Sequence, residues 1–175
     1  MSSEGGRTMG RKGYTLAEIV VVVLILAIAA AIVIGGIGST KDAQVTSAAT
    51  VLAGDLELAR SLALTTQVPH AVVFSSDRQS YKVVANYTGQ AYGSVTAVAH
   101  PVKAGETFEV TLAGLSGMGS VGVTGVNFGG QMYVTFDAEG DPSSAGSVAL
   151  QAGATGMVVS VAALTGTVTV MRTGG

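Results

Sequence analysis

The chain has 175 residues, of which 48% are hydrophobic and 11% are charged, with a formal net charge of −2 and a mean hydropathy of +0.53. This composition argues against a disordered protein, and so weak a net charge gives no global field that would attract nucleic acid. The absence of Cys excludes disulfides, thiol nucleophiles and thiolate metal sites, and two isolated His residues leave little from which to build a zinc centre or a Ser-His-Asp triad.

The hydrophobicity is concentrated near the N-terminus. Residues 19–34 form an unbroken apolar run, and over residues 16–37 only Glu18, Gly35 and Gly36 interrupt the apolar character. As a helix this segment would be about 33 Å long at ~1.5 Å per residue, enough to cross a hydrocarbon core of roughly 30 Å. A secretory signal peptide is the competing interpretation, but its apolar region is only about 7–15 residues long. The sequence therefore predicts one membrane span.

Basic residues orient the predicted span. Arg7, Arg11 and Lys12 precede it, and only Lys41 follows closely. By the positive-inside rule, the N-terminus lies in the cytoplasm and the larger remainder of the chain is extracytoplasmic.

A second helical pattern follows the apolar run. Apolar or small residues recur there at the i, i+3, i+4, i+7 spacing of one helix face. They are Val45, Ala48, Ala49, Leu52, Leu56, Ala59 and Ala63. The opposite face carries polar side chains, namely Lys41, Asp42, Gln44, Asp55 and Arg60.

Together the two patterns predict one long helix over residues 14–66. Its first half (14–38) is membranous, its second half (39–67) is amphipathic, and Pro69 ends it. Gly35, Gly36 and Gly38 stand at the junction, and each costs roughly 1 kcal/mol in a helix relative to Ala, which predicts a kink or a melted turn.

Residues 68–175 change to short β-branched and aromatic runs separated by Gly, Asp and Ser turns. Strands are predicted at residues 70–75, 80–87, 95–102, 107–112, 131–136, 147–151, 157–162 and 167–171. The Gly-rich stretch 115–130 receives no assignment. Several short strands of this kind favour an antiparallel sheet pair or sandwich, so the predicted class is α+β, with the helix packed on a C-terminal antiparallel β-domain.

A single acidic residue stands at the entrance to the apolar run. A carboxylate is costly inside a membrane, so Glu18 is a candidate functional residue. The alternative is purely structural, because Thr15-x-x-Glu18 is a capping-box pattern that would stabilise the helix N-terminus. The two interpretations differ in that Gln also serves in a capping box, whereas only Glu supplies a negative charge.

The segment Arg11-Lys12-Gly13-Tyr14-Thr15-Leu16-Ala17-Glu18-Ile19 resembles the class III signal of type IV pilins and type II secretion pseudopilins. The resemblance implies that residues 1–13 are a cytoplasmic leader, which a prepilin peptidase cleaves after Gly13, and that Tyr14 is then N-methylated. It also implies that Glu18 pairs with the N-terminal ammonium of a neighbouring subunit and sets the register of assembly. Tyr14 replaces the usual Phe, and Ala17 replaces a larger aliphatic residue.

The rest of the chain resembles the GspH/FimT-like minor pseudopilins and pilins through four short motifs in order. They are Leu56-x-x-Ala59-Arg60-Ser61-x-Ala63, Phe136-x-x-x-Gly140, Gly146-x-Val148-x-Leu150 and Thr165-Gly166-x-Val168. The resemblance implies a structural subunit of a secretion or type IV pilus-like filament in the inner membrane. The sequence offers no constellation of nucleophile, base and orienting residue, so neither enzymatic activity nor a cofactor is expected. Implied partners are other pilin-type subunits, the prepilin peptidase and the inner-membrane assembly platform. The alternative is a single-pass membrane-anchored protein whose β-domain binds an extracytoplasmic ligand.

Nucleic acid is not an expected partner. The family often has Arg where this chain has Thr167, which leaves Arg172 as the basic residue of that region. Loss of the leader removes three of nine basic and one of eleven acidic side chains, giving a mature side-chain charge of −4, which disfavours phosphate binding.

Two further groups of polar residues are candidate ligand sites. Asp137, Glu139 and Asp141 alternate in a turn and could offer oxygens to Ca²⁺, although a solvated turn is the preferred interpretation. His70 and His100 lie next to prolines without an acidic cluster nearby, so both are expected on the surface.

Overall fold

The computed structural model describes residues 15–34 and 37–173, with side chains described for residues 15–28 and 40–173. The chain divides into two compact units, Met1–Gly38 and Ser39–Gly175. The helices are α1 (Leu16–Ile34) and α2 (Ile37–Thr66), with short 3-10 turns η1 (Tyr92–Ser94) and η2 (Leu112–Gly114). The strands are β1 (His70–Phe74), β2 (Ser80–Ala85), β3 (Glu109–Thr111), β4 (Gly122–Phe128), β5 (Tyr133–Phe136), β6 (Gly146–Ala152), β7 (Thr155–Val161) and β8 (Val168–Thr173).

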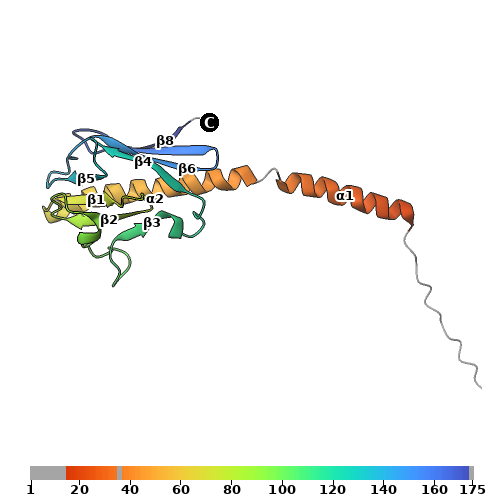
Figure 1. The fold of residues 1–175 in the computed structure, drawn as a ribbon, viewed down its shortest axis with the longest axis horizontal. Helices are drawn as coiled ribbons and strands as arrows, with labels where there is room; N and C mark the ends of the chain where they lie inside the picture. The colour runs from red at the N-terminus through yellow and green to blue at the C-terminus, as the bar shows by residue number, and fades with distance from the viewer. Residues whose placement is uncertain (1–14, 35–36, 174–175) are drawn as a thin grey trace, which may run out of the picture. The chain divides into compact units, whose positions relative to one another are not determined.

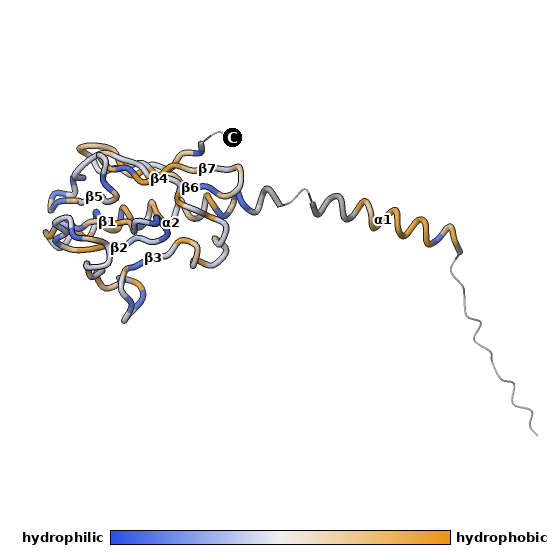
Figure 2. Tube along the Cα trace, viewed as in Figure 1, coloured by the Kyte–Doolittle hydropathy of each residue, from blue (hydrophilic) through white to orange (hydrophobic). Residues whose placement is uncertain are grey.

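Helix α1 is apolar on all sides. Its residues Leu16–Ile34 include one charged side chain, Glu18, in the first turn. Figure 2 shows the described part of α1 as an almost uniformly hydrophobic stretch. The predicted membrane span over residues 16–37 extends beyond α1 into residues outside the described part of the chain. Among the residues that the structure describes, no helix is both long and apolar enough to cross a membrane.

Helix α2 ends where the sequence predicted. Its last residue is Thr66, and Gln67 follows in the left-handed region with φ of 54°. The Gln67 side-chain amide donates to the carbonyl oxygens of Leu64 and Ala138, at 2.8 and 3.1 Å, which satisfies a free carbonyl at the helix end. The kink predicted at the glycine junction falls at Gly35 and Gly36, which lie outside the described residues.

The β-strands form two four-stranded antiparallel sheets, in the orders β3-β2-β1-β5 and β4-β6-β7-β8. Figure 1 shows α2 running along both of them, with β4, β6 and β8 on one side and β2 and β3 on the other. This confirms the predicted α+β class, in which a helix packs on an antiparallel β-domain.

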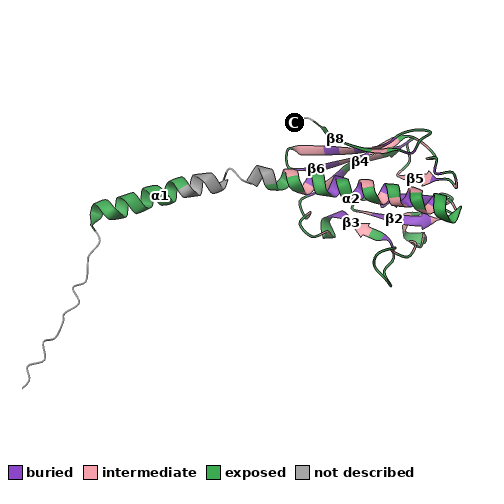
Figure 3. Ribbon diagram, turned by 180° about the vertical axis from the view of Figure 1, so that it is seen from behind, coloured by how far each residue is buried: buried purple, intermediate pink, exposed green. Residues whose placement is uncertain are grey.

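The apolar stripe of α2 is the centre of the core. All seven residues that the spacing predicted are fully buried: Val45, Ala48, Ala49, Leu52, Leu56, Ala59 and Ala63. They join side chains from both sheets, such as Val83 and Phe136 from one and Leu150 and Val159 from the other, in a single hydrophobic cluster. Figure 3 shows the resulting alternation of buried and exposed residues along α2.

One predicted strand was wrong, and one strand of the structure was not predicted. Residues 95–102 form no strand, because Pro101 interrupts the run and the backbone bonds in different directions: Val98 N–H donates to Val83 O, and His100 N–H to Glu106 O. Strand β4 was missed in the Gly-rich stretch. A register shift between Val123 and Gly125 breaks the alternation that would reveal it in the sequence.

Candidate assembly site

The start of α1 carries the residues that the family resemblance singled out. Gly13 and Tyr14 lie outside the described residues. Thr15 precedes the first helical residue, and its hydroxyl accepts a hydrogen bond from the backbone N–H of Glu18 at 3.2 Å. This bond is one half of a capping box, and it uses the backbone of Glu18 rather than its side chain.

The Glu18 carboxylate itself is exposed. Within the described part of the chain, it makes no hydrogen bond or ion pair. The helix N-terminus favours a negative charge at this position. The carboxylate is therefore free to bind a group from another molecule, whereas the cap at Thr15 does not depend on its charge.

Apolar side chains surround Glu18 on α1. Leu16 is 83% exposed, and the described residues from Ile19 to Ile28 include Val22 at 47% and Leu26 at 62%. A helix with this much uncovered apolar surface needs a partner that is itself apolar, such as lipid or other helices.

The C-terminal end of α2 brings together three of the sequence motifs. Arg60 Nε donates to the carbonyl oxygen of Gly140 at 3.0 Å, and Gly166 lies against the same guanidinium. Glu57 accepts from the backbone N–H of Val168 at 3.1 Å and lies 3.8 Å from Arg60. The helix motif, the turn after β5 and the turn before β8 thus meet at Arg60, which holds the last hairpin on the helix.

Gly140 and Gly166 are required by this arrangement. Their φ angles are +82° and +62°, in the left-handed region that glycine tolerates best. A Cβ at Gly166 would lie 2.9 Å from the Gly140 carbonyl oxygen and 3.0 Å from Arg60 Nε. The glycines of the two family motifs are therefore explained by close packing around one arginine.

The polar face of α2 binds the β-domain as well as facing solvent. Asp42 accepts from the Thr155 hydroxyl and from Arg172, the latter at 3.1 Å, and both contacts lower the pKa of its carboxyl. Gln44 accepts from the Ser120 hydroxyl. Sequence reasoning missed these pairs, because residues more than seventy positions apart leave no local signal.

Asp55 is the most buried carboxylate of this face. Burial raises its pKa, and the hydrogen bond from the buried Tyr81 hydroxyl and the charge of His100 lower it in part. The same burial, together with the nearby Asp55 charge, raises the pKa of Tyr81 well above its ordinary value. The pair joins α2 to β2.

The acidic turn at Asp137, Glu139 and Asp141 is held by hydrogen bonds within the turn. The Asp137 carboxylate accepts from the backbone N–H groups of Glu139 and Asp141, at 3.1 and 2.8 Å, and so closes its own turn. Among the described residues, no group of three His, Cys, Asp or Glu side chains is placed to hold a metal.

The prediction of surface histidines was wrong for His70. It is only 5% exposed, and its Nδ1 lies 2.7 Å from the Val68 carbonyl oxygen, because it opens the central strand β1. His100 is half-buried, and its ring packs against Phe108 with centroids 4.7 Å apart.

Comparison with known proteins gives a family and a fold. The family model described as "Type II transport protein GspH" matches residues 48–166, a span that contains the Arg60, Gly140 and Gly166 cluster. No curated protein sequence matches the chain.

Solved structures of a minor pseudopilin and of a type IV minor pilin share the fold. The minor pseudopilin EpsH from the type 2 secretion system of Vibrio cholerae superposes with a TM-score of 0.56 at 11% identity, over 75% of this chain and 99% of that one. The type IV minor pilin FimU of Pseudomonas aeruginosa (strain PAO1) gives 0.51 at 18% identity, over 77% and 92% of the two chains. The chain therefore shares its fold with a minor pseudopilin and a type IV minor pilin, and it belongs to the GspH family of type II transport proteins.

Proposed function

We propose that this protein is made as a prepilin, cleaved after Gly13, N-methylated at Tyr14 and held in the inner membrane by residues 14–38 until it enters a filament. As a GspH-family pseudopilin it assembles with other pilin-type subunits in a membrane-associated filament. The proposal adds the prepilin peptidase and the inner-membrane assembly platform as partners, with the N-terminus cytoplasmic and the β-domain extracytoplasmic.

The observation that carries the proposal is the state of Glu18. Its carboxylate is exposed and without a partner among the described residues, on a helix whose other described side chains from Leu16 to Ile28 are apolar. At 4 Å and an effective dielectric near 20, opposite unit charges attract by about 4 kcal/mol. An ion pair between Glu18 and the ammonium of a neighbouring Tyr14 would set the axial register of helices that otherwise offer only apolar contacts.

Binding of nucleic acid is not part of the proposed function. Arg172, the basic residue of the last strand, already forms an ion pair with Asp42 at 3.1 Å. The mature side-chain charge of −4 also opposes phosphate binding. We likewise propose a structural rather than an enzymatic role, in line with the family.

Mass spectrometry of the mature N-terminus tests the processing. A mature chain that begins at methylated Tyr14 is the expected result. An intact leader, or cleavage after Ile34 as in a signal peptide, would contradict the proposal.

A pair of variants separates charge from capping. Glu18→Gln keeps the hydrogen bond from its backbone N–H to Thr15 but removes the charge, so we expect normal membrane insertion and impaired filament incorporation. Thr15→Val removes the capping hydroxyl, at a cost of about 1 kcal/mol to the helix, and keeps the charge, so incorporation should persist. Normal incorporation of Glu18→Gln would leave Glu18 with a capping role alone.

A further inference from the structure

A pocket lies at one end of the first sheet. It has a volume of about 620 Å³ and opens between the β1–β2 turn and η1. Phe74 and Met132 line its apolar side. Phe74 is buried, and Met132 is half-buried against the main core. None of these residues belongs to the motifs that define the family resemblance.

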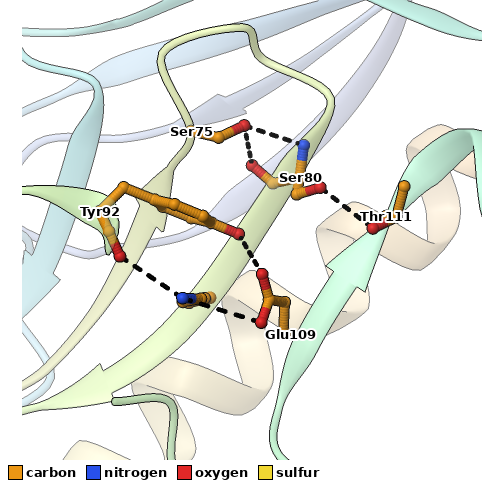
Figure 4. A network of polar contacts seen from close by, with 6 residues as sticks. Ser75, Ser80, Tyr92, Glu109 and Thr111 are labelled. Carbon is orange, nitrogen blue, oxygen red and sulfur yellow. Dashed lines mark hydrogen bonds and ion pairs between the residues drawn. The ribbon is translucent and has the colours of Figure 1, made fainter. Parts of the chain in front are cut away.

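Tyr92 lines one side of the pocket and is held there by polar contacts. Figure 4 shows the Tyr92 hydroxyl donating to Glu109, at 2.9 Å. Lys82 Nζ lies 3.4 Å from the Tyr92 carbonyl oxygen, 3.7 Å from Glu109 and 4.4 Å from the centre of the Tyr92 ring. This lysine does not line the pocket, and its ammonium group already pairs with Glu109.

Ser75, Asp77 and Ser80 line another side of the pocket and are linked by hydrogen bonds. Ser75 Oγ accepts from the backbone N–H of Ser80 at 3.0 Å and lies 2.9 Å from the Ser80 carbonyl oxygen, and the hydroxyls of Ser80 and Thr111 are hydrogen-bonded at 3.0 Å (Figure 4). Ser75 Oγ also lies within hydrogen-bond distance of Asp77 Oδ1, at 2.5 Å. The same Oδ1 accepts from the backbone N–H of Gln79 at 3.0 Å. These bonds lower the pKa of Asp77, so its carboxylate stays ionised. The bonds from Ser75 and Gln79 fix the carboxylate at the pocket through its Oδ1.

Charge decides what the pocket can hold. Asp77 is the one charged residue that lines it, and the other polar lining groups are hydroxyls and the tyrosine. In the described part of the chain, no Lys, Arg or His forms an ion pair with Asp77. The carboxylate of Asp77 repels anions, and a purely apolar ligand would leave the carboxylate and the hydroxyls desolvated. A cationic head on an aliphatic stem satisfies both sides of the pocket.

We propose that this pocket binds the Lys or Arg side chain of a neighbouring subunit in the filament. The aliphatic stem lies along Phe74 and Met132, and the cationic head meets Asp77 beside the Tyr92 ring. The inference rests on the proposed function, because that function supplies the neighbouring subunit. It adds a specific lateral contact on the β-domain to the contacts of the N-terminal helix.

Direct binding is tested on the full-length protein in detergent micelles with n-butylammonium as the probe and 1-butanol as its neutral counterpart. Butylammonium should produce saturable amide shifts at Ser76, Asp77 and Gly93 in NMR spectra, and butanol should not. Asp77→Asn keeps the acceptor for Ser75 and Gln79 but loses the charge, so it should weaken binding about tenfold, the equivalent of one charge-assisted hydrogen bond. Asp141→Asn removes an exposed carboxylate outside the pocket and should leave binding unchanged.

Equal shifts from the two probes, no saturation, or equal weakening by Asp77→Asn and Asp141→Asn would overturn the inference. In the filament, Asp77→Asn and the pocket-filling Ala91→Trp should reduce incorporation several-fold, while N-terminal processing stays normal. Wild-type incorporation of both variants would overturn the inference and leave the proposed function intact. Failure of the wild-type protein to be processed or incorporated would instead contradict the proposed function.

Discussion

The two helices of this chain meet opposite conditions. In α2 the seven stripe residues have no exposed surface, because two sheets of the same chain cover them. In α1 the described apolar side chains remain exposed, with Ile25 at 59% and Leu16 at 83%. Helix α2 is thus stabilised from within the chain, whereas α1 needs partners from outside it. The contrast separates residues that stabilise the β-domain from residues that serve assembly.

The sharpest test of this contrast compares one substitution in each helix. Leu56→Ala should lower the unfolding free energy by about 2–5 kcal/mol, because it removes a fully buried side chain from the core. Ile25→Ala, at an exposed position, should change it by less than about 0.5 kcal/mol. Urea unfolding followed by circular dichroism of the β-domain measures both. Equal losses would show that the helices do not differ as described.

The next largest loss of stability is expected where the last hairpin attaches to α2. Gly166→Ala should cost about 1–3 kcal/mol, because the residue has φ of +62° and its Cβ would press on Gly140 and Arg60. Gly119→Ala serves as the control, since its Cβ would meet nothing within 4 Å. Faster amide hydrogen exchange in β8 than in β6 would locate the loss. If both variants are equally stable, Arg60 does not hold this turn.

The polar contacts of α2 predict a pH dependence. Burial raises the pKa of Asp55 in the folded state, so between its ordinary value of 3.8 and the raised value the folded protein binds more protons than the unfolded one. Ionisation of Asp55 therefore reduces stability as pH rises through this window. Asp55→Asn keeps an acceptor for Tyr81 and should gain stability relative to wild type as pH rises above 3.8. Urea midpoints across this range provide the measurement, and a constant difference between the two proteins would contradict it.

Tyr81→Phe tests the same pair from the other side. It leaves the half-buried Asp55 without its hydroxyl donor and should cost about 1–2 kcal/mol at neutral pH. The loss should shrink in the double variant with Asp55→Asn, which carries no charge at that site. Additive losses would show that the two residues act independently.

The smallest effect concerns the uncovered face of α2. Gly54 is exposed in the middle of the helix, and a Cβ there would meet nothing within 4 Å. Gly54→Ala should therefore raise the unfolding free energy by about 1 kcal/mol through helix propensity. Thermal unfolding measures it, and a loss of stability would indicate a contact on this face.

The features that could be predicted from the sequence are those with a local period. The buried stripe of α2 follows from the 3.6-residue repeat, and most strands follow from runs of β-branched residues, as in Ser147–Gln151 within β6. Strand β4 escaped prediction because two glycines and a register shift hide its alternation. The strand expected at residues 95–102 failed because local β-propensity cannot show where backbone groups find partners.

The residues of the candidate site also divide into those that the sequence predicted and those that it did not. Glu18 was found because a lone charge in an apolar run is visible in the sequence. The roles of Arg60, Gly140 and Gly166 could not be predicted from the sequence, although the motifs that contain these residues were recognised. Their meeting depends on residues about 80 positions apart, as for Arg60 and Gly140. The pocket beside Asp77 likewise requires a turn and a 3-10 segment to come together in space.

Strand β5 has a consequence for folding. It stands between β4 and β6 in the chain but pairs with β1 in the opposite sheet. The polypeptide therefore leaves one sheet, contributes a strand to the other and returns, so the two sheets are tied together by the chain. Both sheets also share the α2 core. Residues 39–173 should consequently lose structure in one cooperative, two-state transition rather than sheet by sheet.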